Sequence, residues 1–228
     1  MPTRSSVPTT ILFDPINKEE RPHSFATVDL EQPKQGIVYE TYRLLGLDLH
    51  TACSVHDQWL RGEDVVAVYT PNDDRNLRAT AMWKQSHVKN ITLWELIASV
   101  TTNNVLGDAS ICVVNEVDIA EVITGSASGK SIDWKHADEK TADCALLRQP
   151  QVGRSLFIAP HPSNRAGFTI EHSSQHTVLK NFFFSAGAER GVLFRCQILA
   201  AVGPAMNDLH WASNIWSEIV NTPPMLSS

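Results

Sequence analysis

The sequence predicts a mainly β protein, folded as an antiparallel β-sandwich with one short helix near its C-terminal end. Runs in which apolar and polar residues alternate recur along most of the chain, and Val, Ile and aromatic residues are common in them. Clusters of Gly, Pro, Asn and Asp separate these runs, which is typical of a sandwich or a closed sheet. Only residues 207–221 show helical spacing of apolar side chains.

Length and composition predict one globular domain. With 228 residues, of which 43% are hydrophobic and 19% charged, the chain can bury a sizeable core without disulfides. Prolines among Ser, Thr and charged residues make residues 1–22 an irregular N-terminal arm. Residues 23–228 are then expected to form a single β-sandwich domain.

The first half of the domain contains the clearest strand pattern. Residues 24–31 alternate between apolar and polar side chains, and residues 37–53 are interpreted as a strand, although their leucines also suit a short helix. A three-strand meander follows, with turns rich in Gly, Asp, Asn and Pro between its strands. Its strands are expected at residues 55–60, 65–70 and 77–84.

The second half combines strands, a loop and the helix. Residues 91–101 and 109–122 are expected to form a long strand pair, and the polar residues 125–140 a long loop. Short strands are expected at residues 144–148, 155–159, 167–172, 177–184 and 191–202. In the helix at 207–221, Asn207 or Asp208 can cap the start, and Trp211 and Trp216 are expected to dock on a sheet.

The net charge, the cysteine spacing and the lack of long apolar runs argue against several classes of function. A formal net charge of -6 disfavours binding to nucleic acid, which needs clustered Lys and Arg. The four cysteines are far apart and are interpreted as buried or free thiols, so neither a metal site nor a cofactor is predicted. The sequence shows no secretory signal and no run of about 18 apolar residues, so we expect a soluble, cytoplasmic protein without a membrane partner.

Residues 125–131, with the sequence GSASGKS, resemble a phosphate-binding loop but do not match one. Such a loop needs four residues between its first Gly and the Gly-Lys-Ser, whereas this segment has three. The following residues also show no helical apolar stripe that could present an N-terminus to a phosphate. A hairpin loop is therefore the preferred interpretation.

Three residues are candidates for acid-base catalysis: His161, Glu95 and Glu171. Glu95 shares a strand face with Ile97 and Ser99, opposite the apolar face, so this mixed face could line a polar concavity. His161 stands between two prolines directly after an apolar strand, where binding groups are frequent. The alternative is that both glutamates face solvent and that the histidine caps a turn.

Tryptophan and arginine residues on neighbouring strands suggest a ligand surface. Sugars stack their C–H faces on aromatic rings, while charged side chains bind their hydroxyl groups. Core packing is the alternative explanation for any single tryptophan. The candidate ligand-binding residues are Trp59, Arg61, Arg78, Trp83 and Trp94.

The chain resembles an uncharacterised bacterial family of β-rich proteins over residues 55–225. The resemblance rests on Trp83, on residues 94–102 and 189–195, on His161-Pro162 and on the helix that ends in Pro-Pro. More remotely, the succession of strands is similar to the galactose-mutarotase-like supersandwich, whose members bind and sometimes isomerise sugars. That likeness implies a supersandwich fold and a general base paired with a His acid, but no motif in this sequence fixes which Glu or His would serve.

Three functions stay open from the sequence. The first is a protein of unassigned activity with a carbohydrate-like ligand surface on a sheet. The second is a sugar epimerase or mutarotase-like enzyme that uses His161 with Glu95 or Glu171 as its acid-base pair. The third is a structural or interaction protein that pairs through a sheet edge or an apolar patch. The oligomeric state is not determined by the sequence.

Overall fold

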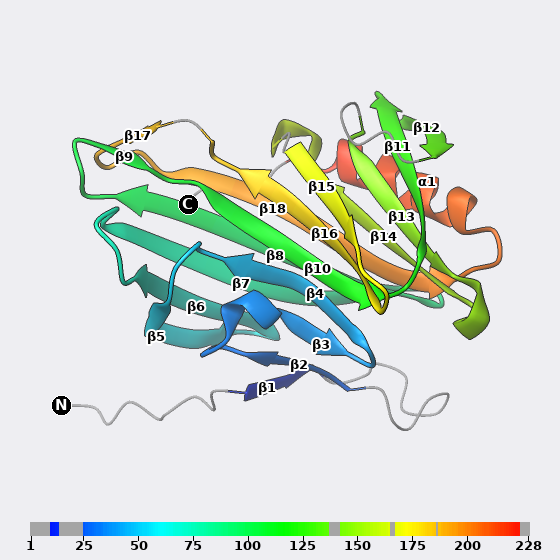
Figure 1. Cartoon of the computed structure of the whole chain (residues 1–228), viewed down its shortest axis with the longest axis horizontal. Coiled ribbons are helices and arrows are strands. Elements are labelled where there is room, and N and C mark those ends of the chain that lie inside the picture. The colour runs from blue at the N-terminus through cyan, green and yellow to red at the C-terminus, as the bar shows by residue number, and fades with distance from the viewer. Residues whose placement is uncertain (1–9, 14–24, 137–141, 165–166, 186, 224–228) are drawn as a thin grey trace.

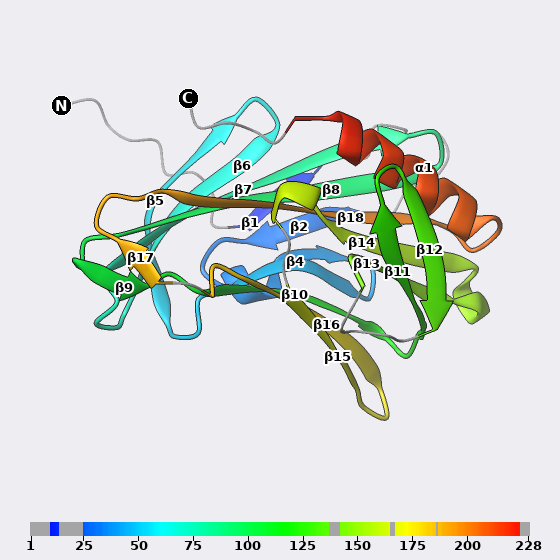
Figure 2. The same cartoon turned by 90° about the horizontal axis from the view of Figure 1, so that it is seen from above.

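Two antiparallel sheets stack face to face, and one α-helix lies on the outer side of the larger sheet (Figure 1, Figure 2). The computed structural model describes residues 10–13, 25–136, 142–164, 167–185 and 187–223. This architecture confirms the predicted mainly β sandwich with a short C-terminal helix.

The strands are distributed over three sheets. The small sheet has seven strands, in the order β1 (Thr10–Phe13), β2 (Ala26–Asp29), β3 (Ile37–Tyr39), β4 (Tyr42–Asp48), β10 (Ile111–Asp118), β16 (His176–Phe183) and β15 (Gly167–His172). The large sheet has nine, in the order β12 (Ser131–His136), β11 (Glu121–Ser128), β13 (Cys144–Gln149), β14 (Arg154–Pro160), β18 (Phe194–Pro204), β8 (Ile91–Thr102), β7 (Leu77–Val88), β6 (Asp64–Pro71) and β5 (Cys53–Arg61). A separate pair contains β17 (Gly187–Glu189) and β9 (Leu106–Asp108). The helical elements are η1 (Pro33–Gln35), η2 (Pro150–Val152), η3 (Pro162–Asn164) and α1 (Asp208–Asn221).

The main core lies between the two large layers. Alternate residues of each strand face it, so β8 directs Trp94 and Leu96 inward, where each is at most 1% exposed. The opposite face of the same strand is also apolar, because Leu93 and Ile97 are buried there in two other clusters. The large sheet therefore has to be covered on both of its faces along β8.

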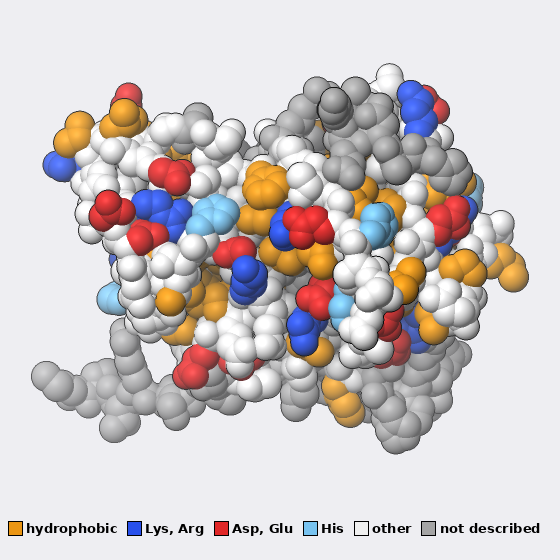
Figure 3. Space-filling model, in the orientation of Figure 1, with side chains coloured by type: hydrophobic (Ala, Val, Ile, Leu, Met, Phe, Trp, Pro, Cys, Tyr) orange, Lys and Arg blue, Asp and Glu red, His pale blue; other side chains and the backbone are white. Residues whose placement is uncertain are grey.

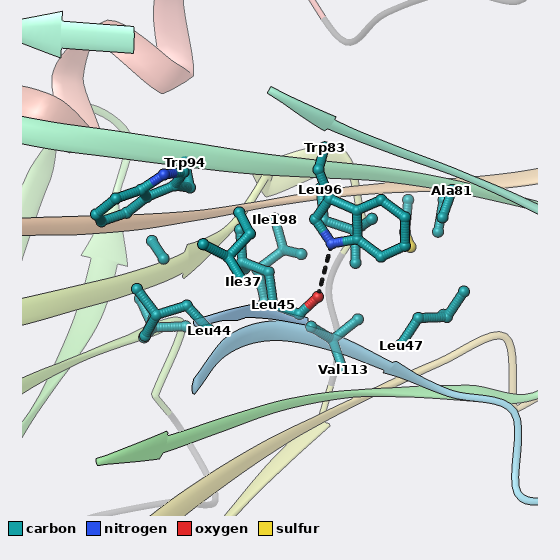
Figure 4. Packing of buried hydrophobic residues seen from close by; sticks show 14 of the residues in the cluster. Ile37, Leu44, Leu45, Leu47, Ala81, Trp83, Trp94, Leu96, Val113 and Ile198 are labelled. Carbon is teal, nitrogen blue, oxygen red and sulfur yellow. Dashed lines mark hydrogen bonds between the residues drawn. The ribbon is translucent and has the colours of Figure 1, made fainter. Parts of the chain in front are cut away.

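A bulge in β4 joins the two layers. Leu45 adopts a positive φ of 56°, and Asn115 of β10 lies opposite both Leu44 and Leu45 instead of a single residue. The Asn115 side-chain oxygen accepts the Leu45 N–H at 2.9 Å, and the Trp83 indole N–H donates to the Leu45 carbonyl at 3.0 Å (Figure 4). Because Trp83 belongs to the large sheet, both backbone polar groups of the buried bulge have partners.

The helix α1 covers part of the outer face of the large sheet (Figure 2). Trp211, Ala212, Ile215 and Trp216 form its buried side and pack with outward-facing residues of β8, β14 and β18. Two indole N–H groups fix the helix further: Trp211 donates to the Pro204 carbonyl at 2.9 Å, and Trp216 to the Gly129 carbonyl at 3.1 Å. The expected docking of both tryptophans on a sheet is confirmed.

An ion pair anchors the start of α1. The Asp208 carboxylate accepts two hydrogen bonds from Arg148 at 2.7 Å and one from the Ser155 hydroxyl at 2.7 Å. Burial opposes ionisation of Asp208, but these hydrogen bonds outweigh it and hold the pKa of the carboxyl below its ordinary value. Of the two predicted caps, Asn207 makes no side-chain capping bond, whereas Asp208 also accepts the Leu209 N–H at 2.8 Å.

Local sequence patterns predicted several elements correctly and others wrongly. The meander at 55–84 is confirmed as β5, β6 and β7, and the helix as α1. The loop predicted at 125–140 was wrong, because a tight turn at Gly129 joins β11 and β12 into a hairpin; residues 137–140 lie outside the described residues.

Two further differences concern pairing across the chain. The predicted pair of 91–101 with 109–122 was wrong, because β8 lies in the large sheet whereas β10 lies in the small sheet and pairs with β4 and β16. Residues 10–13 of the predicted irregular arm form β1, which pairs with β2. The other residues of that arm lie outside the described residues, and so do residues 23 and 24.

The surface of the small sheet carries mixed charges. Basic and acidic side chains alternate on the face drawn in Figure 3, and several are paired, such as Arg43 with Glu116 and Lys180 with Glu171. In the described part of the chain, no helix has the length and apolar character that crossing a membrane would require.

We predict that Trp83→Phe destabilises the fold by about 2–4 kcal/mol, because the buried Leu45 carbonyl loses its donor and a cavity remains. Urea unfolding measures this change. The matched control is Trp59→Phe, whose side chain is 40% exposed and which should cost about 0.5 kcal/mol or less. Equal effects of the two substitutions would contradict the role given to Trp83.

We predict that Asp208→Asn lowers stability at neutral pH by about 2 kcal/mol or more, because Arg148 loses its buried partner. The folded-state pKa of Asp208 lies below its unfolded value, so the carboxylate contributes fully above about pH 5 and its contribution is lost as the pH falls through the folded-state value. Melting temperatures of wild type and variant should therefore converge below about pH 4. Asp133→Asn, at a 70% exposed side chain, is the control, and a pH-independent gap for Asp208→Asn would refute this linkage.

Candidate functional site

A cavity of about 550 Å³ lies between α1 and the outer face of the large sheet. Strands β8 and β18 supply its floor, α1 supplies its roof, and the end of β14 contributes to one side. Most of the lining is apolar and includes Leu93, Leu199 and Ile215, while Glu95 and Gln197 add polar groups. A mainly apolar cavity with a few convergent polar side chains is typical of a small-molecule site.

The register of the large sheet places Glu95 on the outer face. Glu95 pairs with Lys84 of β7 on one side and with Leu199 of β18 on the other. Its neighbours in the chain, Trp94 and Leu96, are buried in the core, and successive side chains of a strand point to opposite faces. The structure thus places Glu95 on the mixed face that the sequence predicted.

Two side chains hold Glu95 in place at the cavity wall. Its Oε1 accepts a hydrogen bond from the Gln197 amide, and its Oε2 lies 3.6 Å from the Lys84 ammonium nitrogen. The Glu95 side chain is 21% exposed. A carboxylate and an amide are therefore presented side by side, in a fixed arrangement, from neighbouring strands.

His161 also lines the cavity, but both of its ring nitrogens are engaged. Nε2 lies 3.0 Å from the Thr222 carbonyl, which can only accept, so Nε2 carries a proton and donates. Nδ1 accepts the Ser163 N–H at 3.2 Å and lies 2.7 Å from the Ser163 hydroxyl. The ring is 5% exposed and ties the last residues of α1 to the end of β14.

The third acid-base candidate lies elsewhere. Glu171 is on β15, at the edge of the small sheet, where its carboxylate lies 2.6 Å from the Lys180 ammonium nitrogen. Figure 2 shows the β15 and β16 hairpin on the opposite side of the molecule from α1. The cavity brings His161 and Glu95 together, and Glu171 is not among its lining residues.

The five candidate ligand-binding residues divide into two groups. Trp83 and Trp94 are buried in the core, at 0% and 1% exposure, so they present no surface to a ligand in this structure. Trp59, Arg61 and Arg78 are exposed, and the register places them on the outer face of the large sheet.

Trp59 is nevertheless separate from the cavity. It stands in one cross-strand row with Val66, Met82, Ile97 and Gln197, each directly opposite the next. Neighbouring strands are about 4.8 Å apart, so four such steps separate Trp59 from Gln197 by roughly 19 Å. The cavity and the Trp59 region are two parts of the same sheet face.

Sequence reasoning missed Gln197 and the contributions of α1 to the cavity. Gln197 is a polar interruption on the outer face of the strand predicted at 191–202, and such an interruption is a usable signal. Trp211 was predicted to dock on a sheet, but only the tertiary arrangement shows that its docking, beside Ile215, leaves a cavity.

The cysteines do not form a reactive centre. Burial raises the pKa of the Cys112 and Cys196 thiols to about 12, and it raises that of Cys144 further. All four cysteines are free. Among the described residues, no group of three His, Cys, Asp or Glu side chains is arranged to hold a metal ion.

A second cleft, of about 500 Å³, lies beside η1 on the other layer. Its charged lining residues are paired, with Lys34 at 2.8 Å from Asp48 and Arg43 at 3.4 Å from Glu116.

No protein-family model matches the sequence, and no curated protein matches it significantly. Solved structures, by contrast, match over most of the chain. A protein of Synechocystis sp. PCC 6803 is 7% identical with a TM-score of 0.57, and the match covers 87% of this chain and 97% of that one.

Two other similar structures have names that refer to sugar chemistry. An Escherichia coli K12 protein, provisionally assigned as an aldose 1-epimerase, is 10% identical with a TM-score of 0.52, over 79% of this chain and 96% of that one. A galactose mutarotase-like protein of Lactobacillus casei is 8% identical with a TM-score of 0.52, over 85% and 99% of the two chains. At such low identity these matches show the fold alone: the chain shares the overall fold of these structures.

Proposed function

We propose that this protein binds a small carbohydrate in the cavity between α1 and the outer face of the large sheet. The observation that carries the proposal is the Glu95 and Gln197 pair, held rigidly in the wall of an otherwise apolar cavity of about 550 Å³. Carboxylate and amide groups bind sugar hydroxyls, and apolar walls accept the C–H faces of the ring.

The known proteins of this fold support the same class of ligand. Of the similar structures, one is provisionally named an aldose 1-epimerase and another is named galactose mutarotase-like. Because a fold hosts many functions, the proposal rests on the cavity and takes only added support from these names. The cytoplasmic location expected from the sequence stays a prediction.

Binding is favoured over catalysis because of the environment of His161. An acid-base catalyst needs a nitrogen within hydrogen-bond reach of its substrate, whereas both nitrogens of His161 are bonded to Thr222 and Ser163. Proton exchange with a ligand would require one of these bonds to break. His161 is therefore assigned to holding the end of α1 over the cavity.

We predict that calorimetric titration with D-glucose, D-galactose and common oligosaccharides detects binding at millimolar or lower concentrations. Glu95→Gln should weaken the affinity about 10–100-fold, because a charge-assisted hydrogen bond to a hydroxyl is lost. Glu171→Gln is the matched control on the opposite layer and should bind like wild type. If Glu171→Gln weakens binding while Glu95→Gln does not, the proposed site is wrong.

We predict that the protein does not accelerate the interconversion of the anomers of D-glucose or D-galactose beyond the buffer rate. Polarimetry from the pure α-anomer measures this directly. An acceleration that is lost in both Glu95→Gln and His161→Gln would instead establish the mutarotase-like alternative, with these two residues as its acid-base pair.

A further inference from the structure

The floor of the cavity changes from polar to apolar along the strands. Gln197 and Glu95 lie near the middle of β18 and β8, and towards the start of β8 the outward-facing residues become Leu93 and Ile91. Leu199 pairs with Glu95 and borders this apolar part. At about 3.3 Å per residue, the four residues from Glu95 to Ile91 span roughly 13 Å.

The roof follows the same trend less sharply. Its end beside His161 carries Glu218, Ile219 and Thr222, whereas its other end carries Trp211, Asn214 and Ile215. The Trp211 ring packs closely on Gly203 near Ile91, where an added Cβ would lie 3.0 Å from the ring. Because the Trp211 N–H is bonded to the Pro204 carbonyl, this indole offers the cavity apolar surface only.

Polar side chains near the apolar end lie at its rim. Lys89 and Asn214 line the cavity and are exposed to solvent, and Val88 beside Lys89 is 50% exposed. This end of the cavity therefore has apolar walls and a solvent-exposed edge. A free hexose that filled this end would leave its hydroxyl groups without partners, which is unfavourable.

We propose that the ligand is a glycoside with an apolar aglycone, and not a free sugar. The sugar lies at the Glu95 and Gln197 end, and the aglycone extends along Leu93 and Ile91 towards Trp211. This inference rests on the proposed carbohydrate function and adds the chemical class of the ligand's second half.

The test is a titration of the whole protein with methyl, butyl, hexyl and octyl β-D-glucopyranosides and the matching galactopyranosides, below their critical micelle concentrations. Affinity should rise by up to about fourfold for each added methylene until the tail outgrows the apolar end. If the methyl glycoside binds and the octyl glycoside binds no more tightly, the aglycone inference is overturned while the sugar site stands.

Two kinds of variant separate the two ends of the cavity. Val88→Gln and Leu199→Gln should reduce the gain in affinity that each longer tail brings. Val88 is the safer site for substitution because its side chain is exposed. Melting curves establish that each variant folds. Glu95→Gln should weaken the methyl and octyl glycosides by the same factor. Val105→Gln, at a 74% exposed position outside the cavity lining, is the matched control. It should change neither the affinity for the methyl glycoside nor the gain in affinity with tail length.

The head-group control uses 1-octanol. It should bind much more weakly than octyl glucoside, because it lacks the hydroxyl groups that Glu95 and Gln197 would bind. Equal affinity for the two, unaffected by Glu95→Gln, would overturn the carbohydrate function itself, and failure of every glycoside to bind would overturn both proposals.

Discussion

The large sheet must bury both faces of its central strands, and the rest of the structure follows from this constraint. On β8, Trp94 and Leu96 require a layer on one side, while Leu93 and Ile97 require cover on the other. The small sheet supplies the first layer and α1 supplies part of the second. Because α1 covers only part of the outer face, a cavity remains where its apolar side meets the polar residues of the sheet.

Three contacts between these layers are of one kind, an indole N–H that donates to a backbone carbonyl. Trp83 reaches Leu45 across the core, and Trp211 and Trp216 reach Pro204 and Gly129 beneath the helix. Each bond gives a backbone carbonyl a hydrogen-bond donor, while the ring fills space. Two of the three tryptophans that suggested a ligand surface in the sequence, Trp83 and Trp94, are thus structural, whereas Trp211, which was expected to dock on a sheet, borders the cavity.

The sequence predicted what local patterns determine. Period-two alternation identified the meander and the outward direction of Glu95, and helical spacing identified α1. The same alternation placed Trp94 on the face opposite Glu95, since adjacent strand residues point in opposite directions, and Trp94 is indeed buried in the core. It could not show that β8 and β10 enter different sheets, because that depends on pairing between distant strands.

The candidate site was predicted in part for the same reason. Glu95 and His161 were recognised as candidates on the sequence and line one cavity. The bond that engages Nε2 of His161, however, comes from Thr222 at the end of α1, 61 positions further along the chain. Glu171 was also predicted to lie on a strand, but that strand belongs to the small sheet, away from the cavity. Which outward-facing residues line the cavity depends on where the helix covers the sheet, and local sequence does not encode that coverage.

The most direct measurement of the central claim is an NMR titration that follows the indole N–H signals of the tryptophans. On addition of octyl glucoside, the Trp211 signal should shift, while those of Trp83 in the core and Trp59 on the distant strand should stay unchanged. A shift of Trp59 with Trp211 unmoved would place the ligand on the open part of the sheet and contradict the account.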